Sequence, residues 1–161
     1  MGLFDFLKAK TGTVIAAPIK GECIPLSKVA DPTFAEEILG KGIAIMPTEG
    51  RVCAPADGEI TTVFPTGHAV GLTTHDGIEV LIHVGLDTVQ LKGQFFQIKV
   101  ETGQSVKKGD LLIEADLEEI RNAGYDTVTP MIICNSTDFS EITCKTEGTV
   151  EVGEEMITCT K

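Results

Sequence analysis

The stretch TGHAVGLTTHDGIEVLIHVGLDTVQLK, residues 66–92, holds all three histidines of the chain and decides how its middle part folds. Over residues 78–84 apolar and polar positions alternate, which is the period of a half-buried strand. His83 falls on the side opposite the apolar row. Asp76-Gly77 separates this run from an earlier one over residues 69–74, and Asp-Gly between two such runs is a strong indication of a hairpin. We therefore predict a β-hairpin with His83 on its outer face.

The register of this hairpin decides whether two histidines meet. With Asp76-Gly77 as a two-residue loop, residue 75 pairs with 78, 70 with 83 and 68 with 85. His68 and His83 are then diagonal neighbours on one face, roughly 7 to 8 Å apart at the backbone, within reach of two imidazoles. A three-residue loop would break this parity. His75 lies at the turn, and we predict that it takes no part in the pair.

Two histidines on one sheet face are often incidental surface residues, so their neighbours matter. His83 is followed closely by Gly85 and Asp87, and His68 is preceded by Thr66-Gly67. Small and hydrogen-bonding neighbours leave ring nitrogens open to a partner. A neutral imidazole is a nucleophile at physiological pH when a hydrogen bond from one nitrogen leaves the other free. The pair is therefore a candidate site for histidine chemistry.

The composition predicts one cytoplasmic domain with an aliphatic core. The 161 residues are 42% hydrophobic but only 5% aromatic. No apolar run approaches the length of a membrane span, and no secretory signal opens the chain. We expect a single domain over residues 13–161. Residues 1–12 are expected to be flexible or weakly amphipathic, with at most weak contact to a membrane surface.

Cysteine usage and charge narrow the class of protein further. The five cysteines are odd in number and never arranged as C-x-x-C, which favours small buried hydrophobes over disulfides or a thiolate zinc site. They are Cys23, Cys53, Cys134, Cys144 and Cys159. A net charge of -11 argues against nucleic acid and for partners that present a basic face, although it also serves solubility alone.

Short strands at regular spacing make up most of the remaining chain. Two short helices are predicted, from the cap at Asp31-Pro32 to Gly40 and from Asp116 to Gly124. The pattern A-P-x-x-G-E occurs at residues 17–22 and again at 54–59, which indicates a duplicated hairpin framework. Together these features predict an all-β sandwich or barrel-like architecture.

Residues 77–89, GIEVLIHVGLDTV, closely resemble the phosphorylation segment of the glucose-family enzyme IIA of the bacterial sugar phosphotransferase system. Further matches follow the order found in that family. They are Ala54-Pro55-Ala56-Asp57-Gly58, Thr66-Gly67-His68-Ala69, Leu91-Lys92-Gly93, Val106-Lys107-Lys108-Gly109-Asp110 and Thr129-Pro130. The resemblance implies an antiparallel β-sandwich built from a duplicated hybrid motif, similar to a barrel-sandwich, with two or three short helices.

The resemblance also implies roles for individual residues. His83 stands where the family is phosphorylated, His68 would stabilise the phosphoryl group in transfer, and Thr66 would orient a ring. The implied donor is the carrier HPr, and the implied acceptor is the IIB domain of a glucose-type sugar permease. No cofactor is required. Relatives can hold zinc through both histidines and a ligand from a regulated enzyme, which makes His68 and His83 candidate zinc ligands.

A partner face is implied around the two histidines. Acidic residues would meet basic partners, while Val70 and Leu81 stand where enteric relatives carry phenylalanine. The predicted members of this face are Asp31, Phe34, Phe64, Val70, Leu81 and Asp87.

Two other functions compete with this interpretation. Residues 83–87 read H-x-G-x-D, part of the metal motif of peptidases with a related β fold, but the further H-x-H that supplies their third zinc ligand is absent. Residues 100–113 resemble turns of biotinyl and lipoyl carriers, without a Met-Lys-Met-like modification site. Since the chain also has no phosphate-binding G-x-x-x-x-G-K-[ST] loop, we expect any phosphoryl group to come from another protein.

Overall fold

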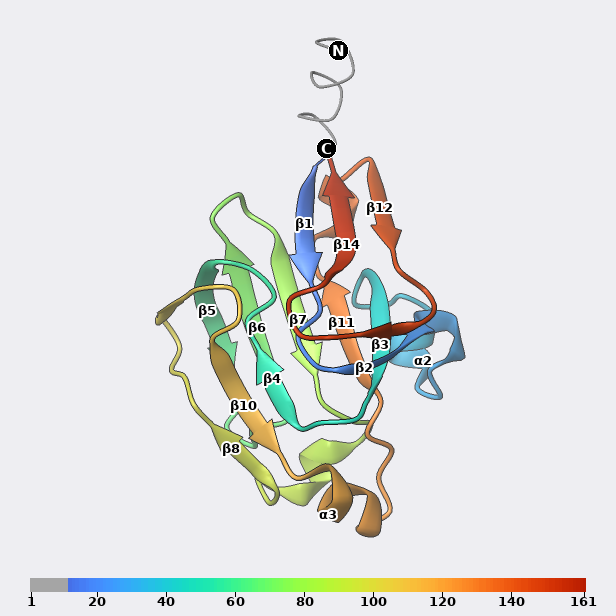
Figure 1. The fold of residues 1–161 in the computed structure, drawn as a ribbon, viewed down its shortest axis with the longest axis vertical. Helices are drawn as coiled ribbons and strands as arrows, with labels where there is room; N and C mark the ends of the chain where they lie inside the picture. The colour runs from blue at the N-terminus through green and yellow to red at the C-terminus, as the bar shows by residue number, and fades with distance from the viewer. Residues whose placement is uncertain (1–11) are drawn as a thin grey trace.

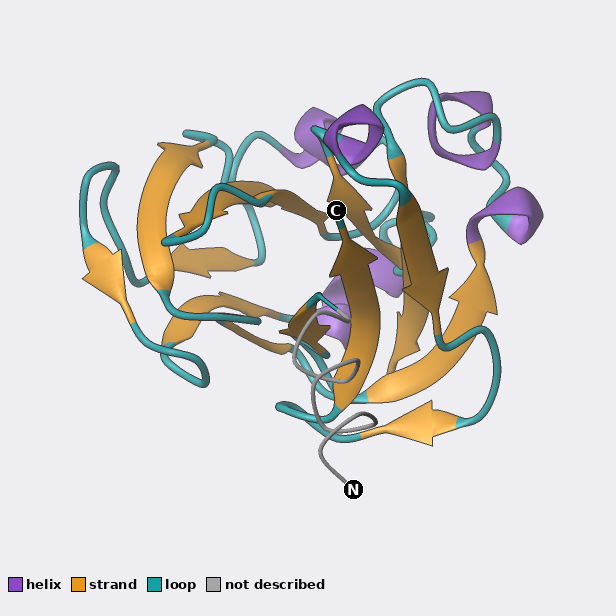
Figure 2. Ribbon diagram, turned by 90° about the horizontal axis from the view of Figure 1, so that it is seen from above, coloured by secondary structure: helices purple, strands orange, loops and turns teal. Residues whose placement is uncertain are grey.

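The computed structural model describes residues 12–161, and most regular structure within them is β-strand (Figure 2). The prediction for residues 1–12 thus lies outside the described residues, apart from Gly12. Among residues 12–161 there are two short helices, α2 (Pro32–Ala35) and α3 (Leu117–Asn122). Single 3-10 turns form η1 (Leu26–Lys28), η2 (Thr88–Leu91) and η3 (Ser136–Asp138).

The strands of the described chain form three antiparallel sheets (Figure 1). One small sheet has the order β1 (Thr13–Ala16), β14 (Glu155–Thr160), β12 (Glu141–Cys144). The other has the order β4 (Arg51–Cys53), β10 (Leu111–Ala115), β8 (Phe96–Ile98). The large sheet runs β13 (Thr149–Val150), β2 (Gly21–Pro25), β3 (Lys41–Pro47), β11 (Thr129–Ile133), β7 (Glu79–His83), β6 (Ala69–Thr74), β5 (Gly58–Val63), β9 (Ser105–Val106). The predicted antiparallel β-sandwich is confirmed.

The strand orders show a duplication. Read inward from its two edges, the large sheet repeats itself: β13 corresponds to β9, β2 to β5, β3 to β6 and β11 to β7. The small sheets correspond in the same way, β1-β14-β12 to β4-β10-β8. The second copy, β4 to β10, is one continuous piece of chain inserted into the first. In each copy the A-P-x-x-G-E unit joins the first two strands, and we call residues 17–22 and 54–59 the two elbows.

The elbows are hydrogen-bonded to each other. The amide of Cys53 donates to the carbonyl of Pro18 over 2.7 Å, and the amide of Ala16 donates to Pro55 over 2.9 Å. Each elbow therefore accepts a hydrogen bond from the residue that directly precedes the other elbow. The segment compared above with biotinyl and lipoyl turns belongs to this framework, because the amide of Gly109 donates to the carbonyl of Ala54.

The main core joins residues from all three sheets and is aliphatic, as predicted. Its largest fully buried side chains, such as Ile45, Ile82 and Leu112, are isoleucine, leucine or methionine. Among the cysteines, Cys23, Cys53 and Cys159 are buried, whereas Cys134 is exposed, so the prediction of burial is wrong for Cys134.

A second apolar cluster lies on the other face of the large sheet. Ala44 and Ile132 alternate with main-core residues along β3 and β11, so their side chains point away from that core. Leu26, Val29 and Phe34 pack on them from residues 26–40, the connection between β2 and β3. This connection covers the outer face of the large sheet over β3 and β11, as far as β7.

The predicted helix after Asp31 is shorter than expected. Asp31 caps it by accepting a hydrogen bond from the amide of Thr33 (3.0 Å), as predicted, but the helix ends at Ala35 and not near Gly40. Glu37 has a φ of 56°, in the left-handed region, which stops an α-helix. In the second helix Asp116 accepts from the amide of Glu119 (3.2 Å), as the capping pattern predicts.

Candidate functional site

His83 lies at the end of β7, where the strand leaves the large sheet. Its neighbours Ile82 and Val84 are fully buried, so the alternation turns the half-buried imidazole to the outer face. The ring Nδ1 is 2.7 Å from the carbonyl oxygen of Gly85. Because a carbonyl only accepts, Nδ1 is the protonated nitrogen and Nε2 carries the lone pair. The free atom of His83 is therefore Nε2.

Gly85 is required where it stands. Its φ is +81°, and a Cβ there would come within 2.5 Å of Thr88 Cγ2 and 2.8 Å of the carbonyl oxygen of Asp126. The amide of Gly85 also donates to the carbonyl of Val128 over 3.0 Å. The carbonyl that orients His83 is thus held in a turn that admits no side chain.

His68 lies in the turn between β5 and β6. Gly67, with φ +74°, reverses the chain, and the carbonyl of His68 accepts from the amide of Val84 over 2.7 Å. The side chain is only 3% exposed, and its Nδ1 is 2.6 Å from the hydroxyl oxygen of Thr66. Thr66 therefore fixes the orientation of the His68 ring.

The two imidazoles meet edge to face. Their ring centroids are 4.9 Å apart with an interplanar angle of 78°. Phe34 lies 5.1 Å from the His83 ring, and Phe64 lies 5.3 Å from the His68 ring. The pair thus lies between one phenylalanine from each copy of the duplicated framework.

The predicted register of the hairpin is wrong, although the histidines do meet. Ala69 pairs with His83, which leaves a three-residue loop over residues 75–77. Thr74 holds this loop, since its hydroxyl accepts from the amide of Ile78 (2.9 Å) and donates to Asp76 (2.6 Å). Asp76 also accepts a hydrogen bond from the hydroxyl of Thr13. His68 reaches His83 because it sits in the turn before β6, outside the alternation of the strand.

Burial keeps both histidines neutral near neutral pH. It is the main cause that lowers the pKa of His68 to about 4, and the nearby His83 lowers it further. Burial also lowers the pKa of His83, against the hydrogen bond to Gly85 and the charges of Asp31 and Asp87, which act to raise it. Each ring therefore has one unprotonated nitrogen.

The low pKa of His68 predicts a loss of stability in acid. Between pH 6.5 and about 4 the unfolded chain binds a proton on His68 that the folded chain does not, so the free energy of unfolding falls by ~3 kcal/mol across this range. His68→Gln should show a smaller fall, because glutamine does not titrate. Urea denaturation at about pH 7.5 and about pH 4 measures both. Equal falls in the two proteins would contradict the predicted role of His68.

The predicted partner face needs one correction. Val70 pairs with Ile82, is 1% exposed and packs in the main core, so its side chain is not available to a partner. Val70 was named from the resemblance, and the predicted register, in which residue 70 pairs with 83, agreed with that placement. Gly71 is the residue of β6 that pairs with Leu81 on the outer face, and the sequence analysis missed it.

The other predicted face residues differ in exposure. Phe64 is 36% exposed, Leu81 and Asp31 are half-buried, and Asp87 is exposed. Phe34 is 4% exposed, so it mainly supports His83 and offers little surface of its own.

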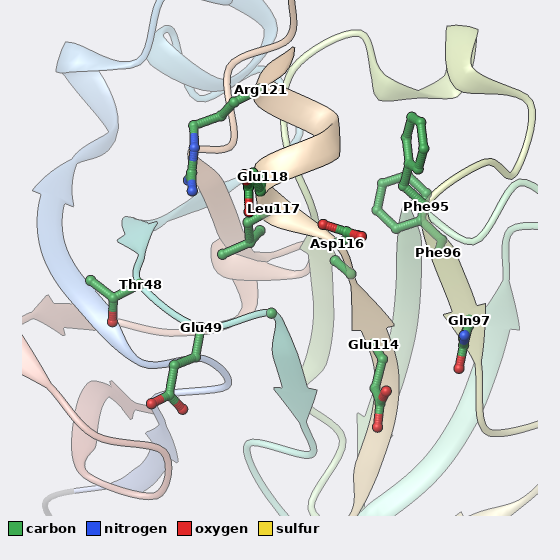
Figure 3. A pocket seen from close by; sticks show the side chains of 12 residues that line it. Thr48, Glu49, Phe95, Phe96, Gln97, Glu114, Asp116, Leu117, Glu118 and Arg121 are labelled. Atoms are coloured by element: carbon green, nitrogen blue, oxygen red, sulfur yellow. The ribbon is translucent and has the colours of Figure 1, made fainter. Parts of the chain in front are cut away.

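A cavity of about 670 Å³ lies away from the histidines. It is lined by the loop with Thr48 and Glu49, by the end of β10 and by α3. Figure 3 shows Arg121 on one side of it and Phe95 with Phe96 on the other. No histidine lines it. Size alone therefore does not mark the candidate site.

Metal-binding side chains do not gather in the described chain as a hydrolase requires. Within residues 12–161 no group of three or more His, Cys, Asp or Glu residues is placed to hold a metal ion. The H-x-G-x-D interpretation thus lacks the three protein ligands of a catalytic zinc. None of the helices formed by residues 12–161 is both long and apolar enough to cross a membrane.

His75 lies at the exposed tip of the β6–β7 hairpin, in the three-residue loop. His75→Ala should leave phosphoryl transfer unchanged, within about twofold, because surface substitutions away from a site have small effects. Initial rates of phosphate incorporation in both proteins measure this. A large drop would mean that the hairpin tip belongs to the site.

A histidine with a free Nε2 beside a buried second histidine, on the outer face of an antiparallel β-sandwich, is the arrangement expected of a phosphohistidine carrier. Comparison with known proteins gives the family. Residues 13–139 match the family described as phosphoenolpyruvate-dependent sugar phosphotransferase system, EIIA 1. The chain belongs to this family, and it is a phosphotransferase component of sugar transport with a phosphohistidine intermediate.

Individual relatives agree with this assignment. The chain is 46% identical over 144 residues to the PTS system beta-glucoside-specific EIIBCA component of Bacillus subtilis, covering 89% of this chain and 24% of the relative. It is 49% identical over 135 residues to that of Dickeya chrysanthemi, covering 84% and 21%. The chain thus spans about a quarter of their length. Glucose permease IIA from Mycoplasma capricolum superposes with a TM-score of 0.82 at 35% identity, covering 91% of this chain and 94% of that one.

Proposed function

We propose that His83 is the phosphorylated residue and that Nε2 is the atom that carries the phosphoryl group. The observation that supports this most is the hydrogen bond from His83 Nδ1 to the carbonyl of Gly85, which leaves Nε2 as the nucleophile. His68 is the poorer candidate, because it is only 3% exposed and less open to another protein.

In the proposed reaction the phosphoryl group arrives from the phosphohistidine of HPr. The lone pair on Nε2 of His83 forms a new P–N bond as the P–N bond of the donor breaks, and the donor imidazole leaves with that electron pair. Transfer onward reverses the roles, since a nucleophile of the IIB acceptor attacks phosphorus and the His83 imidazole leaves. No bound nucleotide or metal ion takes part in either step.

His68 stabilises the transferred group in this proposal. When Thr66 donates its hydroxyl hydrogen to Nδ1 of His68, the ring proton lies on Nε2 and can be donated to a phosphoryl oxygen. A phosphoryl dianion on His83, beside a ring whose centroid is 4.9 Å away, favours the cationic form of His68. His68 would thus be neutral before phosphorylation and able to become a cation afterwards.

A direct labelling experiment tests the assignment. The chain is incubated with phosphoenolpyruvate, enzyme I and HPr, and the acid-labile phosphate is mapped by mass spectrometry under alkaline conditions. We expect one phosphate, on His83. Phosphate on His68, or on a residue outside the pair, would contradict the proposal.

The acceptor in this proposal is the IIB domain of a glucose-type sugar permease. The curated relatives are EIIBCA components, in which IIB and IIC accompany the IIA domain. Since HPr is a cytoplasmic carrier in these systems, we place the site in the cytoplasm. Transfer of phosphate from the labelled chain to the isolated IIB domain of the Bacillus subtilis relative tests this partner, and failure of a loaded chain to donate would count against it.

With the other tautomer of His68, in which Nδ1 donates to the hydroxyl of Thr66, both Nε2 atoms carry a lone pair and are suited to hold a shared zinc ion, in line with the resemblance. Zinc in proteins prefers four ligands, so His68 and His83 would supply two and a partner protein the others. Both Nδ1 atoms are occupied by hydrogen bonds, to Thr66 and to Gly85, which is the usual support of a zinc-binding imidazole.

A further inference from the structure

A small hollow opens on the outer face of the large sheet, on the side of the histidines away from Phe34. It has a volume of about 210 Å³, and Thr62, Gly71 and Leu81 lie in one row across its floor, on the neighbouring strands β5, β6 and β7. Phe64, Glu79 and Cys134 also line it. The hollow exists because the middle residue of the row has no side chain.

Gly71 is not required by the backbone. It lies inside strand β6, opposite a bulge of β5 between Ile60 and Thr62, and its φ is outside the positive region that favours glycine. A Cβ there would meet Thr61 Oγ1 at 3.4 Å and Thr62 Cβ at 3.5 Å, which are ordinary contacts. Glycine inside a strand weakens it relative to alanine, and it often marks a bulge or a place where another molecule approaches closely.

The hollow is continuous with the candidate site. Leu81 and His83 are alternate residues of β7 on the same face, and the Phe64 ring that lines the hollow is also in contact with His68. A protein that brings its reactive atom to His83 Nε2 therefore covers the hollow as well.

Charge around the hollow favours a basic partner. Glu79 lies at its edge, and Asp31 and Asp87 lie close enough to His83 to influence its pKa. Within residues 12–161 none of these three carboxylates takes part in a salt bridge. With a net charge of -11 on the chain, they are available to lysine or arginine residues of another protein.

We propose that the hollow at Gly71 is a specificity pocket for the IIB acceptor, filled by one bulky apolar side chain that basic residues flank on the IIB surface. The proposal rests on the function proposed above, because it concerns docking at the same histidine. An apolar side chain in a small pocket, ringed by polar contacts, is the usual form of an energetically dominant interface residue. Gly71 sets the depth of the pocket, and Phe64 and Leu81 form its walls.

The test separates docking from chemistry. His83 is loaded with phosphoramidate, a small donor that needs no docked protein, and transfer to the IIB domain of the Bacillus subtilis relative is then measured against IIB concentration. Gly71→Phe fills the hollow and should raise KM for IIB by about tenfold or more, with kcat little changed. Gly71→Ala fills it partly and should have a smaller effect of the same sign.

Thr143→Phe is the matched control, because it adds the same ring at an exposed strand position in a different sheet, on β12. It should leave KM unchanged, and thermal denaturation should show that all three variants are folded. An unchanged KM in both Gly71 variants, or an equal rise in Thr143→Phe, would overturn the pocket. If the unsubstituted chain is never phosphorylated on His83 by phosphoramidate or by HPr, it is the proposed function that fails.

Discussion

His83→Gln is expected to abolish phosphate acceptance while the protein remains folded. The amide nitrogen of glutamine is not nucleophilic, so the substituted side chain cannot form the P–N bond. Its amide can still donate to the carbonyl of Gly85, which the imidazole contacts at 2.7 Å. We expect incorporation of acid-labile phosphate from phosphoenolpyruvate, enzyme I and HPr to fall by at least about 10³-fold, to background.

Far-ultraviolet circular dichroism and the thermal midpoint serve as controls for this variant. Because His83 is half-buried on the outer face of the large sheet, the midpoint should shift by only a few degrees. Phosphate that still appears on the variant would place the nucleophile elsewhere, and His68 would then be the first residue to examine.

For His68→Gln we expect a separation of the two half-reactions. The variant should accept phosphate from HPr at a rate within about tenfold of the unsubstituted chain, because an amide can donate a hydrogen bond to a phosphoryl oxygen. Donation to IIB should fall by about 10²-fold or more, because glutamine cannot become the cation that stabilises the departing phosphoryl group. Quench-flow measurements with phospho-HPr and with IIB give the two rates.

Thr66→Val offers a related comparison for the His68 experiment. It keeps the imidazole but removes the hydroxyl 2.6 Å from Nδ1, so it should weaken both steps moderately and leave donation possible. Equal losses of acceptance and donation in His68→Gln, or no loss in either, would mean that His68 has a structural role only.

The sequence predicted the elements of the site better than their geometry. The alternation over residues 78–84 correctly placed His83 opposite the buried row, and the resemblance identified the pair. The loop length was wrong because Thr74 and Asp76 close a three-residue loop, with a second hydrogen bond from Thr13 of β1. A contact between residues 63 positions apart is invisible to a local turn rule.

The same limit explains what was missed on the partner face. The resemblance named Val70, and the predicted register did not expose the mistake, because a shift of one residue exchanges the two faces of a strand; Gly71 was overlooked for the same reason. The low pKa of His68 was equally out of reach, because it depends on burial produced by the turn at Gly67 and by the ring of Phe64. Sequence patterns gave the candidates, and tertiary packing determined which faces they occupy.

The insertion of one structural copy within the other has a consequence for how this domain can be joined to others. The outer copy supplies both the first strand, β1, and the last, β14. These strands pair with each other, with Thr13 opposite Cys159, so the two ends of the described chain lie side by side. They leave from the opposite end of the molecule to α3 (Figure 1). A neighbouring domain joined to either end of this domain would therefore connect to it on the same side of the molecule. The same module thereby suits both separate carriers and long fused permeases.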